Sequence, residues 1–126
     1  MRSMLRSMLR SKVLLVTGFA LLLAAAPAMA HHALAAVYDT RQSIMLKGTV
    51  TKIVWNNPHV HLYLQAMDKA ASDTRWDFEM GSPNLLLLNG WKIDTFRQGD
   101  RVVVTAYPAR DGSRIGYASK VALNTQ

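Results

Sequence analysis

The sequence predicts a mainly β protein, a small five-stranded OB-like Greek-key barrel with one short helix between strands 3 and 4. Two observations predict it: five stretches of the chain carry strand signals, and the one clear helix signal falls between the third and the fourth of them. Three strands, a helix and two further strands follow one another in the same order in OB-type barrels. A simple antiparallel sheet packed on one helix would give the same succession and is the alternative.

The first three strands are expected from β-branched and alternating residues. Residues 44–55 are rich in β-branched side chains, and Gly48 within this run indicates a bulge or a sharp bend. After the turn signal at residues 56–58, polar and apolar side chains alternate from His59 to Ala66. Residues 75–80 alternate in the same way. We therefore expect each of these two strands to have one buried apolar face and one polar face.

The helix is expected from its capping residues. Ser82-Pro83 is typical of an N-cap followed by proline in the first turn, which predicts a short helix over residues 84–89 that ends at Gly90. Four of its residues are consecutive leucines. Because four successive positions cover all sides of a helix, we expect this helix to be well buried.

The remaining strands complete the domain. Residues 101–107 contain three consecutive valines, and Asp111-Gly112 predicts a hairpin turn into a last strand at residues 114–123. The expected division of the chain has three parts: a signal peptide at 1–30, an N-terminal arm at 31–43 and a single OB-like β domain at 44–126.

The first thirty residues have the organisation of a secretory signal peptide. A basic stretch is followed by a largely apolar run at residues 13–26, then by Pro27 and the small-residue cleavage signal Ala28-Met29-Ala30. A transmembrane anchor is the alternative, but the apolar run is shorter than the roughly 20 residues of a span. We therefore expect cleavage after Ala30, export to the periplasm and no stable membrane anchor afterwards.

Cleavage also changes the charge. The whole chain of 126 residues has a net charge of +7. Residues 1–30 hold four of its 15 basic residues and none of its 8 acidic ones, which leaves +3. The basic composition is therefore weak support for a nucleic-acid partner, and an exported protein rarely meets one, so we expect no nucleic acid as a partner. The chain contains no cysteine, so core packing or a ligand must stabilise it without disulfides.

All four histidines of the chain fall into two close pairs. His31-His32 would begin the mature chain, where the α-amine and the imidazole of His31 can share one metal ion. His59 and His61 lie two residues apart on a strand and project from the same face. Imidazole suits copper and zinc, and copper(II) also accepts an amine nitrogen. The sequence thus predicts a transition-metal site, copper(II) first and zinc second, with ligands from His31, His32, His59 and His61.

Two acidic residues are candidates to support this site. Asp77 and Glu79 alternate with apolar residues on the third strand. If they lie on the same face of the sheet as the histidines, either one is a candidate metal ligand or a candidate hydrogen-bond acceptor for a histidine. Each histidine pair also has a simpler interpretation. His31-His32 can be a soluble start that suits translocation, while His59 can cap the turn and His61 can lie on a solvated strand face.

We expect that the protein is not an enzyme. The chain lacks a cysteine nucleophile and a Gly-x-Ser-x-Gly motif, and its serines lie in turn contexts. The alternative to a metal-binding protein is a binding or accessory module for a protein, glycan or small ligand, in which the histidines are incidental. Aromatic side chains on the curved face of an OB-type barrel would serve such a module. The candidates, of which most are expected to be buried, are Trp55, Tyr63, Trp76, Trp91, Tyr107 and Tyr117.

Several short motifs are shared with a known family. The signal peptide ends next to His31-His32, and further motifs follow along the whole mature chain: Gly48-Thr49-Val50-Thr51, Trp55-Asn56-Asn57-Pro58-His59, Trp76 with Glu79, Gly90-Trp91, Gly99-Asp100 and Ala109-Arg110-Asp111-Gly112-Ser113. On these motifs the chain resembles a family of short exported proteobacterial proteins of unknown function. The resemblance implies export and a single small β domain, and it implies no substrate, reaction or cofactor.

Overall fold

The computed structural model describes residues 33–66 and 74–125. The chain splits into two compact units, Met1–Ala35 and Ala36–Gln126. His31 and His32 lie outside the described residues. Of the helices in the described part of the chain, none is long and apolar enough to cross a membrane.

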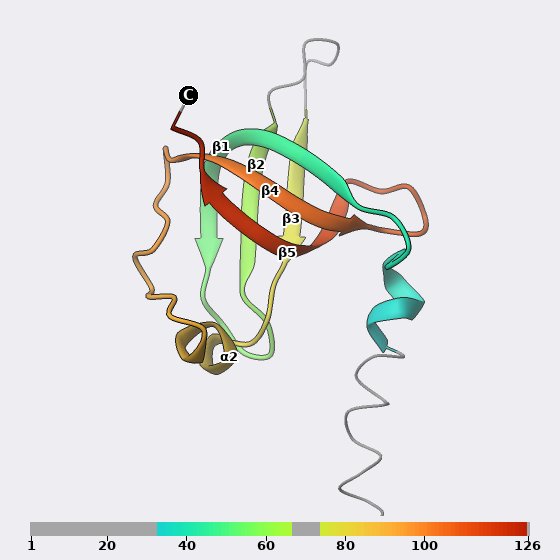
Figure 1. Cartoon of the computed structure of the whole chain (residues 1–126), viewed down its shortest axis with the longest axis horizontal. Coiled ribbons are helices and arrows are strands. Elements are labelled where there is room, and N and C mark those ends of the chain that lie inside the picture. Colours follow the sequence, from blue (N-terminus) through green and yellow to red (C-terminus); the bar gives the residue numbers. More distant parts are fainter. Residues whose placement is uncertain (1–32, 67–73, 126) are drawn as a thin grey trace, which may run out of the picture. The chain divides into compact units, whose positions relative to one another are not determined.

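Five strands and one short helix make up the second unit (Figure 1). They follow one another in the predicted order, which confirms the predicted fold class: β1 (Ile44–Val54), β2 (His61–Ala66), β3 (Arg75–Glu79), α2 (Pro83–Leu88), β4 (Arg101–Pro108) and β5 (Ile115–Leu123). The second strand begins two residues later than the alternation predicts. His59 therefore precedes β2, and Val60 is held by backbone hydrogen bonds to Met80 and Gly81.

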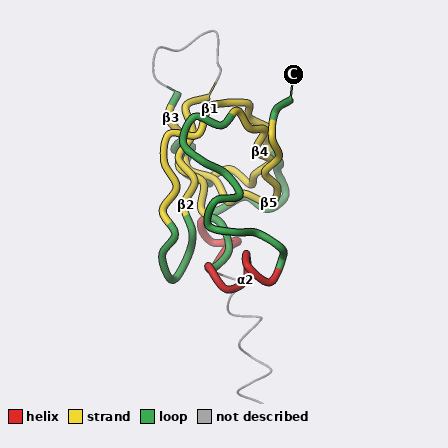
Figure 2. The backbone as a smooth tube through the Cα atoms, turned by 90° about the vertical axis from the view of Figure 1, so that its left-hand side faces the viewer, coloured by secondary structure: helices red, strands yellow, loops and turns green. Residues whose placement is uncertain are grey.

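The strands close into a barrel in the order β1-β2-β3-β5-β4. All neighbouring strands are antiparallel except β3 and β5, which run parallel over only three residue pairs. Figure 2 shows the strands curving around a common interior, with α2 beyond one end of the barrel. Closure distinguishes this fold from the simple antiparallel sheet that the sequence left as the alternative.

The core fills the interior of the barrel with the apolar members of the alternating strands. Its largest fully buried side chains come from β1, β2, β3, β4 and the residue before β2: Phe78, Leu62, Leu64, Val50, Val60, Val102 and Val104. The intervening residues of β2 and β3 are partly exposed. The predicted division into an apolar and a polar face is therefore confirmed for both strands, and the polar faces lie outside the barrel.

Gly48 lies where two strands approach closely. A Cβ atom at this position would lie 2.5 Å from the backbone oxygen of Gln65 and 2.7 Å from Cγ of Leu64. The shift in register that the sequence placed at Gly48 occurs slightly later, between Val50 and Lys52. The glycine therefore allows β2 to approach β1 closely, and the irregular pairing of β1 lies a few residues after the glycine.

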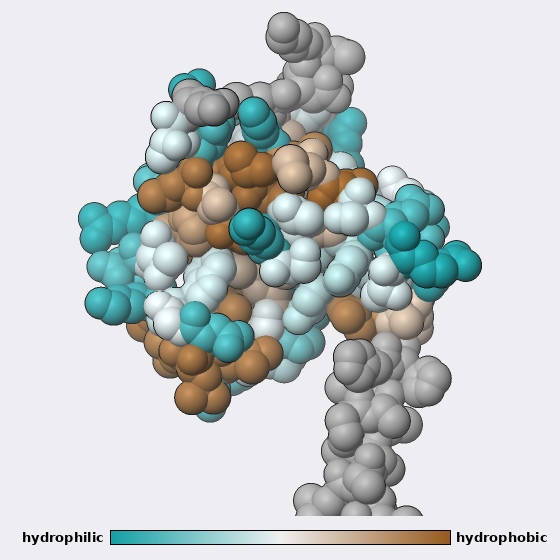
Figure 3. All heavy atoms as spheres, viewed as in Figure 1, coloured by the Kyte–Doolittle hydropathy of each residue, from teal (hydrophilic) through white to brown (hydrophobic). Residues whose placement is uncertain are grey.

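The helix is less buried than the sequence predicts. Only Leu86 is buried, whereas Leu85 and Leu87 are each 49 % exposed and Leu88 is 85 % exposed. The reason is geometric: α2 lies across one end of the barrel, so only one side of the helix meets the core. Apolar side chains accordingly gather on the surface near α2 (Figure 3).

Part of the N-terminal arm packs onto the barrel. Residues 33–37 are helical, and Tyr38 and Asp39 are buried. Tyr38 forms an isolated antiparallel bridge with Ala109, next to the end of β4. The side of the barrel made by the β4–β5 hairpin therefore holds the arm at Tyr38 and Asp39.

Candidate functional site

The outer face of β2 and β3 carries two histidine–carboxylate pairs. Nδ1 of His61 lies 2.8 Å from Oδ1 of Asp77. Nδ1 of His59 pairs with Oε1 of Glu79. The strand register explains this pairing, because His61 lies opposite Glu79 and therefore diagonally opposite Asp77. The expectation that Asp77 and Glu79 share the face of the histidines is met.

The pairing sets the chemistry of both imidazole rings. A carboxylate can only accept a hydrogen bond, so Nδ1 of each neutral ring carries the proton and the free lone pair is on Nε2. The side chains of His59 and His61 are 44 % and 34 % exposed, more than those of Glu79 and Asp77. Each ring thus contacts an acid through Nδ1 and remains partly exposed.

A tyrosine of the arm joins the same group of residues. The hydroxyl of Tyr38 donates a hydrogen bond of 2.5 Å to Oε2 of Glu79, while His59 occupies Oε1. Burial, and next the hydrogen bond to Glu79, raise the pKa of Tyr38, so its phenol stays protonated as a donor. Sequence reasoning missed this residue because the arm has no periodic pattern that would assign Tyr38 to a face.

A second tyrosine packs on the other pair. The rings of His61 and Tyr63 stack with centroids 6.3 Å apart, and Nζ of Lys52 lies 5.8 Å from the centroid of Tyr63. Burial, and then the negative charge of Asp77, raise the pKa of Tyr63. The alternation in β2 places Tyr63 on the histidine face, so this neighbour was predictable from the strand period alone.

The described residues do not by themselves make a complete metal centre. In residues 33–66 and 74–125, no group of three or more His, Cys, Asp or Glu side chains is arranged to hold one metal ion. Asp77 and Glu79 each contact one imidazole ring in this structure, those of His61 and His59. The expected terminal ligands, His31 and His32, lie outside the described part of the chain.

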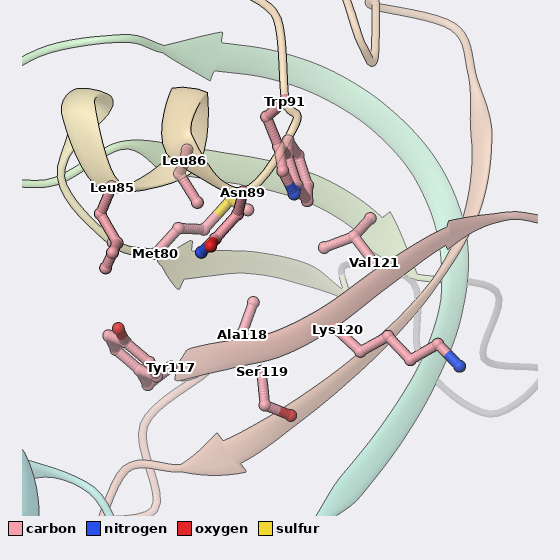
Figure 4. Close-up of a pocket in the computed structure, with 11 residues that line it drawn as sticks. Met80, Leu85, Leu86, Asn89, Trp91, Tyr117, Ala118, Ser119, Lys120 and Val121 are labelled. Carbon is pink, nitrogen blue, oxygen red and sulfur yellow. The ribbon is translucent and has the colours of Figure 1, made fainter.

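A separate pocket of about 190 Å³ opens between α2 and β5 (Figure 4). It lies where β5 continues beyond its short pairing with β3. Figure 4 shows the amide of Asn89 directed toward the space between the helix and β5. The other residues around it are mostly apolar, among them Met80, Leu86, Trp91 and Val121.

Two tryptophans of the aromatic set pack against the core. Trp76 stacks on Phe78 with centroids 5.6 Å apart, and Trp91 packs against Phe96 at 5.1 Å. Trp55 is also partly buried against the core cluster. These three rings are therefore partly buried against the core and contribute to its packing.

Solved structures match the chain at low sequence identity. Two crystal structures of the mitochondrial single-stranded DNA binding protein Rim1 from S. cerevisiae are each 12 % identical to this chain with a TM-score of 0.49. The matches cover 65 % of this chain and 92 % and 91 % of the two Rim1 chains. No curated protein matches the chain.

One expectation needs correction after these comparisons. We withdraw the expectation that nucleic acid is not a partner: the two solved structures above are of single-stranded DNA binding proteins. At 12 % identity the likeness itself concerns the fold.

Membership of a family follows from the sequence match. A family model matches residues 20–118, which is most of the chain and nearly all of the barrel. The resemblance noted in the sequence to a family without an established activity is thereby confirmed. The chain belongs to a family of unknown function, DUF6152.

Proposed function

We propose that this protein is an exported, non-enzymatic metal-binding protein of the periplasm that takes copper(II) first and zinc second. Its ligands are His59 and His61 on the barrel and His31 and His32 at the start of the mature chain. The observation that carries the proposal is the pairing of Nδ1 of His59 and His61 with Glu79 and Asp77.

This pairing is the arrangement that metal-binding histidines use. A carboxylate that accepts the Nδ1 proton fixes the tautomer, orients the ring and raises the basicity of Nε2. Here two rings that are separated by one residue both have it. Imidazole nitrogen favours copper and zinc over magnesium or calcium, and copper(II) is bound most tightly in the divalent series.

The arm joins the barrel next to one of the two histidine pairs. Tyr38 hydrogen-bonds the carboxylate that orients His59, so the arm reaches the barrel at this site. His31 would also offer its α-amine after cleavage behind Ala30, since copper(II) accepts amine nitrogen.

The chemistry of the face supports binding without catalysis. Asp77 and Glu79 each hold a histidine ring. They are therefore engaged as acceptors and are not poised as an acid–base couple around an open space. We accordingly assign no substrate and no reaction to this face.

Titration of the protein that begins at His31 with copper(II) tests the proposal. We expect one ion per chain, and the double variant H59A/H61A should bind it more weakly by well over tenfold, since loss of outer partners alone costs about 10–100-fold. A variant with one extra N-terminal glycine should also bind more weakly, because it displaces the amine from His31.

Two results would contradict the proposal in different ways. Binding by H59A/H61A that equals the wild type would leave only a chelate at the terminus. An absence of copper(II) and zinc binding by the wild type would remove the metal function altogether. The alternative, a module for a protein, glycan or small ligand, would then be the function to pursue.

A further inference from the structure

The pocket between α2 and β5 forms because two strands separate there. β3 pairs with β5 only over residues 77–79, opposite residues 115–117. Beyond Tyr117, β5 continues to Leu123 and pairs with β4. α2 lies on the other side of the resulting gap, and the small side chain of Ala118 on β5 leaves a space of about 190 Å³ (Figure 4). The fold therefore holds a preformed space that the histidines do not line.

The walls of this space are mostly apolar. Figure 4 shows the side chains of Ser119 and Lys120 directed away from α2. The remaining walls include the side chains of Met80, Leu86, Trp91 and Val121. An apolar cavity of about 150 Å³ is large enough to hold benzene. This pocket therefore has room for one ring with a small polar group attached.

Two polar groups of the pocket are available to a ligand. Among the described residues, neither the side-chain amide of Asn89 nor Nε1 of Trp91 has a hydrogen-bond partner. Figure 4 shows both directed toward the space beside β5. The side-chain amide can donate and accept, and the indole can donate. Together they match a ligand amide, whose oxygen accepts hydrogen bonds and whose N–H donates one. Asn89 is exposed, so a ligand can reach it from the solvent.

The charges around the pocket favour a neutral ligand. None of the described residues that line it is acidic, so a buried cation would have no carboxylate to pair with. Burial, and next the negative charge of Glu79, raise the pKa of Tyr117, which lines one side. The same negative charge would repel an anion on that side. An uncharged polar group is therefore the one that this pocket accommodates best.

We propose that the pocket between α2 and β5 binds a small, uncharged molecule with an apolar body and an amide group. The ligand amide pairs with the side chain of Asn89, and its oxygen also accepts from Nε1 of Trp91. The apolar body lies against Met80, Leu86 and Val121. This site is independent of the histidine face and does not require a metal.

Benzamide is the probe, with benzoate as its charged analogue and toluene as the analogue without a polar group. NMR of the 15N-labelled protein that begins at His31 follows the indole N–H of each tryptophan. We expect benzamide to shift the Trp91 signal with a dissociation constant of about 1 mM or lower. The signal of Trp76, which does not line the pocket, should stay in place. Benzoate and toluene should bind about tenfold more weakly, because neither can both donate to and accept from Asn89.

Two asparagines of the same helical segment provide a variant and its matched control. Asn89→Ala removes the side-chain amide and keeps the backbone bonds that cap α2. Asn84→Ala removes an exposed amide that does not line the pocket. We expect N89A to weaken benzamide binding about tenfold and to leave toluene binding unchanged. N84A should match the wild type with both probes.

Four results would overturn the proposal. An unshifted Trp91 signal at about 10 mM benzamide would remove the site itself. Wild-type benzamide affinity in N89A would show that Asn89 does not pair with the ligand. Benzoate or toluene binding as tight as that of benzamide would contradict the preference for an amide. Equal weakening in N89A and N84A would mean that a disturbed helix, and not the loss of one amide, explains the effect.

Discussion

Tyr38 and His59 contact the two oxygens of a single carboxylate, Oε2 and Oε1 of Glu79. One of these residues belongs to the N-terminal arm and the other directly precedes β2. The shared acid therefore holds Tyr38 of the arm at the outer face of β2 and β3, where His61 and Asp77 form the second pair. Tyr38, Glu79 and His59 therefore form one hydrogen-bonded group beside the second pair.

The leucines of α2 should differ sharply in their contribution to stability. Leu86 is 7 % exposed and belongs to the core cluster, so L86A should lower the free energy of unfolding by about 2–5 kcal/mol. Leu88 is 85 % exposed, and L88A should change it by less than about 0.5 kcal/mol. Urea unfolding of the two variants compares them directly. A similar cost for both would mean that the helix is buried on more than one side.

Gly48 should not tolerate a side chain. A methyl group there would meet the backbone oxygen of Gln65, which cannot move without disturbing the pairing of β1 and β2. We expect G48A to lower the free energy of unfolding by about 1–3 kcal/mol. Gly81 is the control, because its methyl group would meet only the flexible end of the Leu85 side chain. Thermal unfolding in which G81A is the more damaging variant would contradict this account of the close approach.

Asp39 should make the attachment of the arm depend on pH. Hydrogen bonds from Arg41 hold the pKa of this carboxyl below its usual value of 3.8. A lowered pKa in the folded state stabilises the fold above the usual value, and this contribution is lost as the pH falls through the folded-state pKa. D39N should therefore be less stable than the wild type at pH 7, and the difference should shrink below about pH 4. Urea unfolding as a function of pH measures the difference in stability between D39N and the wild type. A difference that grows as the pH falls would contradict the prediction.

The position of the mature N-terminus is directly measurable. When the full chain is expressed in a Gram-negative host, we expect the periplasmic protein to begin at His31, since Ala28-Met29-Ala30 forms the cleavage signal. Intact mass spectrometry of the periplasmic fraction gives the result. A product that retains residues 1–30, or one found only in the cytoplasm, would contradict the expectation of export.

The alternating patterns predicted much of the fold. They also predicted which side chains of β2 and β3 lie on the polar face that carries the site. The period of two from His59 to Ala66 placed both histidines on the polar face, and the same period in β3 placed Asp77 and Glu79 there. Which acid meets which histidine depends on the register between β2 and β3. No local pattern sets that register, because it follows from how the two apolar faces meet in the core.

The contacts of the arm and of the helix could not be predicted in the same way. Tyr38 lies in a stretch without periodicity, so its bridge to Ala109 and its bond to Glu79 arise only from tertiary packing. The leucines of α2 were misjudged for a related reason. A composition that suits burial on all sides does not tell how many sides of a short helix meet the core, and here only Leu86 does.

The most direct test of the central claim is the copper(II) EPR spectrum of the protein that begins at His31, compared with that of H59A/H61A at one equivalent of metal. The account predicts one species in the wild type, with imidazole nitrogen from both histidine pairs. It predicts a different spectrum in the double variant, in which only the terminal ligands remain. Identical spectra in the two proteins would show that His59 and His61 do not bind the metal.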